Sequence, residues 1–290
     1  MLKVTRKQLI TIGVAVFATT LSYAINNFVN LGALNGGKPA GAVVGASTTG
    51  IVSALFFKDF AVAGYIAAFA GMSATTVIPS IWYAPVFGLM AGIFTILMAK
   101  LFVGYGGKAG TTCFCATNVT LAFFIVLGTL GLTQFNINAH FRALTLSDLD
   151  PTWILTAVVA GVFGIMVTVL LREKVLQKRK VPNEVILGSA IVALVSALVL
   201  PWIVPSLASK IAAVVASGTY AGMVSRKIIA ADIHLVMAGI VVGLLNVFMS
   251  TVFMGVGGRL GFMGLLGIAL FRYLEANAHK PAQPKAVTKA

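Results

Sequence analysis

The chain has 290 residues, and its composition excludes an ordinary soluble domain, because 59% of the residues are hydrophobic, only 10% are charged and the mean hydropathy is +1.00. A soluble domain of this size carries roughly a quarter charged residues. The net charge of +14 does not indicate nucleic-acid binding, because the basic residues stand in short clusters between apolar runs. Runs such as 8–25, which contains no Asp, Glu, Lys, Arg or His, approach the ~20 apolar residues that a helix needs to cross a bilayer.

The alternation of apolar runs with breaks predicts an all-α polytopic membrane protein with ten transmembrane helices. The first run follows MLKVTRK and is longer than the apolar part of a secretory signal, so it is interpreted as the first span. The tail from Glu275 is rich in Ala, Lys and Pro and is predicted to be disordered. In chain order, the predicted spans are 8–28, 41–57, 61–80, 84–103, 109–131, 152–171, 185–204, 208–225, 233–254 and 259–274.

The basic residues predict the orientation of these spans. A cytoplasmic N-terminus places 17 of the 21 Lys and Arg residues on the cytoplasmic side and leaves Lys38, Arg142, Lys210 and Arg259 outside. The three tryptophans then fall at the outer interface, where an aromatic belt is expected. We therefore expect a multi-pass protein of the plasma (inner) membrane, with both termini in the cytoplasm and anionic lipids beside its cytoplasmic loops.

An internal repeat divides the chain into residues 1–145 and 146–290. When 69–110 is aligned with 220–261 at a fixed offset of 151, 12 of 42 positions are identical, and seven of those are Gly. A second block pairs VGASTTGIVSAL with LGSAIVALVSAL at an offset of 143. The sequence therefore predicts two five-helix repeats.

Five is an odd number of spans, so the second repeat must enter the membrane from the side opposite to the first. This arrangement resembles the plan of five-plus-five carriers and of urea-type channels, a plan that unrelated families share, and the resemblance involves none of their motifs. Inverted repeats of this kind hold their solute near the midplane, between the two halves. We expect the same placement here.

The most complete repeated phrase is FVGYGGKAGT, echoed by FMGVGGRLGF. Its glycines allow one helix to stop and the next to begin within a tight turn, and the free N–H groups of that next helix, together with a basic side chain, favour an anion or a carbonyl oxygen. We expect one such site on each face of the membrane; the alternative is a helical hairpin whose cation reaches lipid headgroups. The candidate binding residues are Gly106, Gly107, Lys108, Gly257, Gly258 and Arg259.

Two further repeated elements lie within the predicted spans. An Ala-Gly-Met break at Gly71 and Met72, repeated at Gly222 and Met223, is a candidate for unwinding a helix so that its carbonyl groups face a solute, with close helix packing as the alternative. The G-x-x-x-G pairs at 88–92 and 239–243 favour close packing of the fourth and ninth helices, which we expect to lie against each other.

Polar residues inside the fifth and ninth helices supply the remaining candidates for a solute path, and they are Thr111, Cys115, Asn118 and Asn246. The pair Cys113 and Cys115 occurs in one half only and is interpreted as packing. No metal site or cofactor is expected.

The predicted spans contain no Asp or Glu, which argues against proton coupling and against selection of cations. We therefore expect a channel or uniport-like carrier for a small neutral or anionic solute. The alternative is a non-transporting membrane scaffold or a subunit of a larger complex. No nucleophile–base pair or metal box supports an enzyme. The identity of the solute and the existence of a homo-oligomer are left open.

Overall fold

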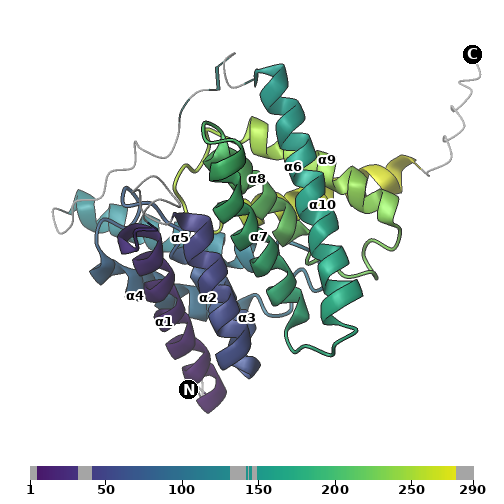
Figure 1. The fold of residues 1–290 in the computed structure, drawn as a ribbon. Helices are drawn as coiled ribbons and strands as arrows, with labels where there is room; N and C mark the ends of the chain where they lie inside the picture. The colour runs from purple at the N-terminus through teal and green to yellow at the C-terminus, as the bar shows by residue number, and fades with distance from the viewer. Residues whose placement is uncertain (1–4, 32–40, 131–141, 143, 146–148, 279–290) are drawn as a thin grey trace, which may run out of the picture.

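The computed structural model describes residues 5–31, 41–130, 142, 144–145 and 149–278. These residues form an all-helical fold without strands (Figure 1). A π-helical segment, Leu171–Leu176, continues α6, and single 3-10 turns precede α3 and α4. The ten α-helices are α1 (Arg6–Phe28), α2 (Ala42–Phe56), α3 (Ala61–Ala70), α4 (Ala84–Leu97), α5 (Lys108–Thr129), α6 (Pro151–Leu170), α7 (Glu184–Ile203), α8 (Ala208–Ala221), α9 (Asp232–Phe248) and α10 (Arg259–Ala278).

Four of the described helices are long and apolar enough to cross a membrane, namely Arg6–Phe28, Lys108–Thr129, Pro151–Leu176 and Glu184–Ile203. Ala42–Phe56, Ile81–Leu97 and Asp232–Phe248 are apolar but shorter. The prediction of ten helices, one for each apolar run, is therefore confirmed.

Several helix ends differ from the predicted ones because glycine and turn residues stop a helix before its apolar run ends. α3 ends at Ala70 rather than at residue 80, and α8 ends at Ala221 rather than at residue 225. α4 and α9 likewise end about six residues early, after Leu97 and Phe248. At ten residues, α3 is about 15 Å long, roughly half the thickness of the hydrocarbon core.

The C-terminal helix differs in the other direction, since α10 continues through Ala278 and includes Glu275, from which a disordered tail was predicted. The remainder of that tail, 279–290, lies outside the described residues. Glu173 was placed beyond the sixth span, but it lies within the π-helical continuation of α6.

Helices of each half pack in the same order. α1 contacts α2, α3 and α4, while α6 contacts α7, α8 and α9. The G-x-x-x-G glycines lie at the closest approaches, because a Cβ at Gly88 would be 2.7 Å from the Val16 Cα of α1, and one at Gly239 would be 2.6 Å from the Val162 Cα of α6. The expectation that α4 and α9 face each other was therefore wrong: each lies against the first helix of its own half.

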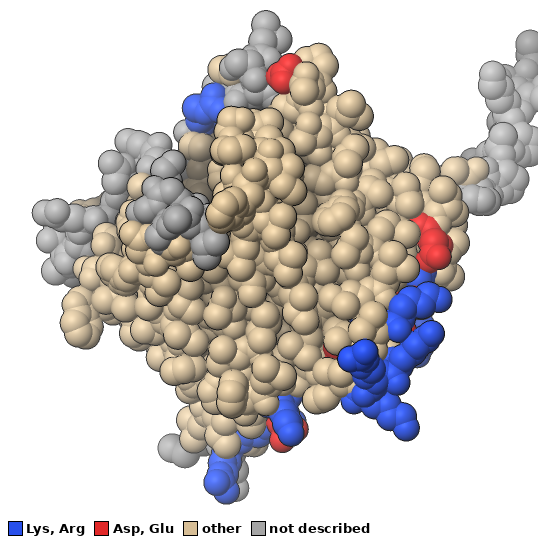
Figure 2. All heavy atoms as spheres, in the orientation of Figure 1, with Lys and Arg blue, Asp and Glu red and all other residues tan. Residues whose placement is uncertain are grey.

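α1 and α6, the first helices of the two halves, run in opposite directions. Figure 1 shows α1 starting beside the N label at the lower end of the molecule, whereas α6 starts at the upper end. On the face that Figure 2 shows, Lys and Arg gather at the lower end and the lower right, below a broad surface without charged residues. The two halves join where α2 packs on α7 and α5 packs on α10.

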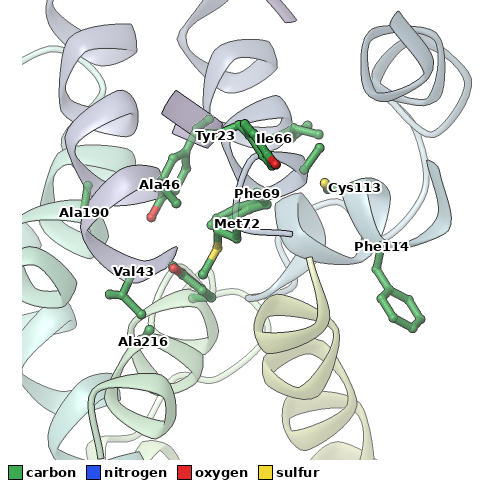
Figure 3. Packing of buried hydrophobic residues seen from close by; sticks show 14 of the residues in the cluster. Tyr23, Val43, Ala46, Ile66, Phe69, Met72, Cys113, Phe114, Ala190 and Ala216 are labelled. Atoms are coloured by element: carbon green, nitrogen blue, oxygen red, sulfur yellow. The ribbon is translucent and has the colours of Figure 1, made fainter. Parts of the chain in front are cut away.

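The largest hydrophobic cluster lies across this junction. It combines Tyr23, Phe69 and Met72 of the first half with Ala190 and Ala216 of the second. Figure 3 shows Phe69 and Met72 at its centre, between Val43 and Ala46 on one side and Cys113 on the other. The largest core cluster is thus shared by the two halves, whereas smaller clusters lie within one half.

Candidate functional site

The candidate site is the seam between the halves, by which we mean the contact surface between residues 5–130 and residues 149–278. The two glycine phrases lie in it with matching backbone geometry. Phe102, Gly104 and Gly107 have φ angles of 51°, 85° and 79°, and the residues 151 positions later have φ angles of 53°, 74° and 82°. Such positive φ angles favour glycine, which explains the two repeated glycines of each set.

Each glycine loop is bound to the place where a helix of the other half stops. Gly107 N–H donates to the Tyr220 carbonyl oxygen (2.7 Å), and Ser225 N–H donates to the Gly104 carbonyl oxygen (2.8 Å). Reciprocally, Ala74 N–H donates to the Gly255 carbonyl oxygen (2.9 Å). The loop N–H groups expected to bind a solute are therefore used in part to hold the halves together.

The loops approach the opposite half so closely that no side chain fits. A Cβ at Gly106 would collide with the carbonyl oxygen of Ala221, and one at Gly257 would collide with that of Phe69. The first turns of α5 and α10 meet directly, since a Cβ at Gly110 would lie 2.5 Å from the Gly261 Cα. The two loops thus come together in the seam, which contradicts the expectation of one separate loop site on each membrane face.

The cation of each phrase caps the helix that precedes it. Lys108 Nζ donates to the Ala99 carbonyl oxygen (2.7 Å) after α4, and Arg259 Nη2 donates to the Met249 carbonyl oxygen (2.6 Å) after α9. A positive charge is favourable beside the free carbonyl groups at a helix C-terminus. Arg259 Nε is buried and has no hydrogen-bond partner in the structure.

The Ala-Gly-Met breaks do end helices, and the carbonyl groups that they free are bound by the protein. Asn26 Nδ2 of α1 donates to the carbonyl oxygens of Gly71 (3.2 Å) and Ser73 (3.3 Å). At the equivalent carbonyls of the other half, Arg172 Nη1 donates to Gly222 (3.1 Å) and Val224 (2.9 Å). Met72 is buried and Met223 is half-buried beside these breaks.

Ion pairs reinforce the break of α8. Both Glu173 carboxylate oxygens accept from Arg226, through Nε and Nη2 at 2.8 Å each, and Glu173 also accepts from Arg172 Nη2 (2.8 Å). Arg226 pairs in addition with Asp232 at the start of α9 (2.7 Å). The hydrogen bonds to Glu173 raise the pKa of Arg226 above its usual value. This network joins α6, the segment after α8 and α9.

A chain of hydroxyl groups crosses the seam. Tyr65 Oη on α3 lies 3.1 Å from Ser189 Oγ on α7, which donates to Thr219 Oγ1 on α8 (3.2 Å). The Tyr220 ring lies 4.7 Å from Phe69, its equivalent in the first half, and 6.3 Å from Tyr65. Tyr220 Oη is buried without a hydrogen-bond partner, as are hydroxyls of α2 and α5 at Ser47, Thr49, Ser53 and Thr112.

The polar candidates of α5 and α9 do not gather into one lining. Thr111 Oγ1 and Asn118 Nδ2 bond to carbonyl oxygens one turn back in their own helix, Gly107 at 3.1 Å and Phe114 at 2.7 Å. Asn246 Nδ2 likewise donates to the Val242 carbonyl oxygen (2.9 Å), and its Oδ1 also accepts a hydrogen bond from Ser217 on α8 (3.2 Å). Cys115 is half-buried, and both cysteines are free thiols.

Sequence reasoning missed Tyr65 and Thr219, which no repeat or motif marks, and it also missed Ser189, although this residue lies in the repeated block LGSAIVALVSAL. It also missed Arg172 as a buried helix cap, since a basic residue near the end of a span is typical of a cytoplasmic edge. Tyr220 did carry a signal, namely its alignment with Phe69 beside the conspicuous Ala-Gly-Met phrase.

The structure holds no group of three or more His, Cys, Asp or Glu residues placed to bind a metal ion within its described residues. The candidate site consists of glycine loops, hydroxyl groups and two aromatic rings at the junction of the halves. No protein-family model, no curated protein and no solved structure matches this chain.

Proposed function

We propose that this protein is a multi-pass membrane transport protein in which two inverted five-helix repeats pass a small neutral or anionic solute along the seam. The observation that carries the proposal is the reciprocal meeting of four helix ends, those of α3 and α8 with the starts of α5 and α10. Broken helices that meet between inverted repeats are the usual place of a transporter's solute site.

Inverted duplication is supported by contacts that repeat under exchange of the halves. Ala74 bonds to Gly255 as Ser225 bonds to Gly104, each pair being related to the other by the offset of 151. Equivalent residues also touch each other, as Phe69 does Tyr220, which is the behaviour of residues beside a twofold axis. With five spans per half, that axis lies in the membrane plane.

Placement in the plasma membrane, with cytoplasmic termini, is supported by the distribution of charge. On the face that Figure 2 shows, Lys and Arg gather at the lower end and lower right of the molecule, and anionic cytoplasmic lipid attracts such basic segments. This orientation puts the Arg172–Glu173–Arg226 network on the cytoplasmic side.

The class of solute follows from the side chains of the seam. The buried polar residues in the described part of the chain are Ser, Thr, Asn and one Arg, without a carboxylate. Hydroxyl groups can both donate and accept, so they suit neutral solutes with amide or hydroxyl groups. The converging N-termini of α5 and α10 also favour an anion, because each carries the positive end of a helix dipole.

A specific observation favours a second function, that of a non-transporting scaffold. The seam is closed in this structure by the Phe69–Tyr220 contact and by glycines packed on backbone. Transport therefore requires the halves to move apart, whereas a scaffold does not. The two proposals predict opposite results in a flux assay.

The deciding experiment is solute flux into proteoliposomes that contain the purified protein. Urea and glycerol serve as neutral probes in a swelling assay, and nitrate and formate serve as anionic probes in an exchange assay, with protein-free liposomes as control. We expect uptake of at least one probe well above the control. Equal uptake with and without folded protein, for every probe, would favour the scaffold.

Variants of Lys108 and Arg259 distinguish transport of anions from transport of neutral solutes. Lys108→Gln and Arg259→Gln remove positive charge at the starts of α5 and α10 while leaving the glycine loops intact. Anion uptake is expected to fall in both variants, and uptake of neutral solutes to remain. If anion uptake stays at the wild-type level, these cations act only as helix caps.

A further inference from the structure

A deep apolar slot opens between α6 and α7 and has α8 as its floor. Its volume is about 510 Å³. Leu155 and Val159 of α6 and Val199 of α7 form its exposed rim, whereas Ile211 and Val215 of α8 are 8% and 3% exposed and lie at its bottom. Each helix contributes residues four positions apart, which places them on one face of that helix.

The chemistry of the walls excludes a polar solute. The twelve lining residues include no charged side chain, and their only side-chain hydroxyls are those of Thr156 and Ser196. Thr156 Oγ1 is already used, because it donates to the Thr152 carbonyl oxygen (2.7 Å). An occupant of this slot is therefore held by apolar contact.

The length and chemistry of the slot suit a hydrocarbon chain. The α6 wall from Leu155 to Phe163 extends over about 12 Å. A lipid acyl chain is one methylene wide and entirely apolar, so it matches walls that offer apolar contact along that length.

The outer end of the slot carries the features of a headgroup site. Trp153 lies two residues before the α6 wall begins, and Lys210 lies one residue before the α8 floor begins. The Lys210 ammonium stands 5.7 Å from the centre of the Trp153 ring. Trp202, which is 65% exposed, is next to Ile203 at the same end of α7. Tryptophan marks the membrane–water interface, and lysine there attracts phosphate.

We propose that the slot binds one acyl chain of an anionic phospholipid of the outer leaflet, with the lipid phosphate at Lys210. The apolar walls hold the chain, and Lys210 selects the headgroup. This proposal rests on insertion of the protein in a membrane and is independent of transport. Bound lipid would contact α8, the broken helix that ends in the seam.

The test is native mass spectrometry of protein that has been delipidated in detergent and titrated with either dioleoylphosphatidylglycerol or dioleoylphosphatidylcholine. Wild-type protein is expected to bind one phosphatidylglycerol more tightly than phosphatidylcholine, by about fivefold if one lysine near the surface contributes ~1 kcal/mol. Lys210→Gln is expected to bind both lipids equally, whereas Val159→Trp fills the slot and is expected to lose both.

Matched controls carry the same changes elsewhere on the surface. Lys100→Gln removes another exposed cation, and Val119→Trp enlarges an exposed residue of α5. Both should bind lipid as the wild type does. Undiminished binding by a folded Val159→Trp variant overturns the slot, and an unchanged preference in Lys210→Gln overturns the headgroup site. A wild-type dimer that Val159→Trp converts to monomer would assign the slot to a second copy of the chain.

Discussion

At the scale of the residue, the glycines of the repeated phrase act mainly by having no side chain. Gly106 and Gly257 lie against backbone carbonyl groups of the opposite half. Those carbonyls accept hydrogen bonds within their own half, and the loops are hydrogen-bonded across the seam, so neither can move aside without breaking a bond. Tight backbone contact between the halves therefore depends on single atoms at a few positions.

Gly106→Ala is expected to destabilise the protein because the added methyl group collides with the Ala221 carbonyl. Overpacking of this kind costs ~1–3 kcal/mol. Thermal unfolding in detergent, measured as the loss of monodisperse protein on heating, should show a lower midpoint for this variant than for the wild type. Gly13→Ala is the matched control, since its methyl group meets nothing within 4 Å and alanine favours helix there. Equal midpoints for the two variants would mean that the loops can shift.

How far the sequence predicts these residues depends on what the repeat exposes. The repeat identified the glycines and the two cations, and the glycines that it pairs at the offset of 151 have similar positive φ angles. It did not predict their partners, because contact between Gly106 and Ala221 depends on how two distant segments dock. Tyr65 and Ser189 were beyond reach for the same reason: a hydroxyl in an apolar helix is informative only when its neighbour is known.

At the scale of the element, α3 and α8 stop at equivalent residues but are capped by different chemistry. A neutral amide, Asn26, binds the carbonyls freed by α3, whereas a guanidinium, Arg172, binds those freed by α8 and carries the ion pairs of Glu173 and Arg226 with it. The end of α8 is therefore held by charge, and the end of α3 is not.

Arg172→Met is expected to destabilise the protein strongly, because it leaves the Gly222 and Val224 carbonyls without this donor and removes one partner of Glu173. Each unsatisfied buried acceptor costs ~1–3 kcal/mol. The same thermal assay should show a fall in midpoint that the neighbouring exposed change, Lys174→Met, does not produce. Similar midpoints in both variants would show that water replaces the guanidinium.

Helix existence was predictable and helix ends were not. Apolar content gives the number and order of the helices, but it does not mark the end of α3, because residues 71–80 still include Met72, Val77 and Ile78 and contain no charged residue. That segment leaves the helix because Asn26, Gly255 and Gly257 satisfy its backbone and the Ser73 hydroxyl from outside. Hydropathy does not register such partners, so it extends a half-length helix across the whole membrane.

At the scale of the whole molecule, the contacts between the two halves support the proposed twofold axis. The same exchange of hydrogen bonds occurs twice, and equivalent residues touch where the axis would pass. The duplication stays a prediction from sequence identities. The same reasoning placed Lys108 and Arg259 on opposite faces. Their loops meet in the seam, because each follows a helix, α4 or α9, that ends about six residues before its predicted end.

This arrangement determines where the inverted topology can be tested. Positions 108 and 259 are close to the junction and are poor reporters of sidedness, whereas the first turns of α1 and α6 are exposed and lie at opposite ends of the molecule (Figure 1). Lys7→Cys and Thr152→Cys, each made alone in a Cys113→Ser/Cys115→Ser background, lie on either side of the five spans proposed for the first half. An impermeant maleimide applied to intact cells should label residue 152 and spare residue 7, and inverted vesicles should reverse the pattern. Labelling of both positions from the same side would rule out an odd number of spans per half and, with it, an axis in the membrane plane.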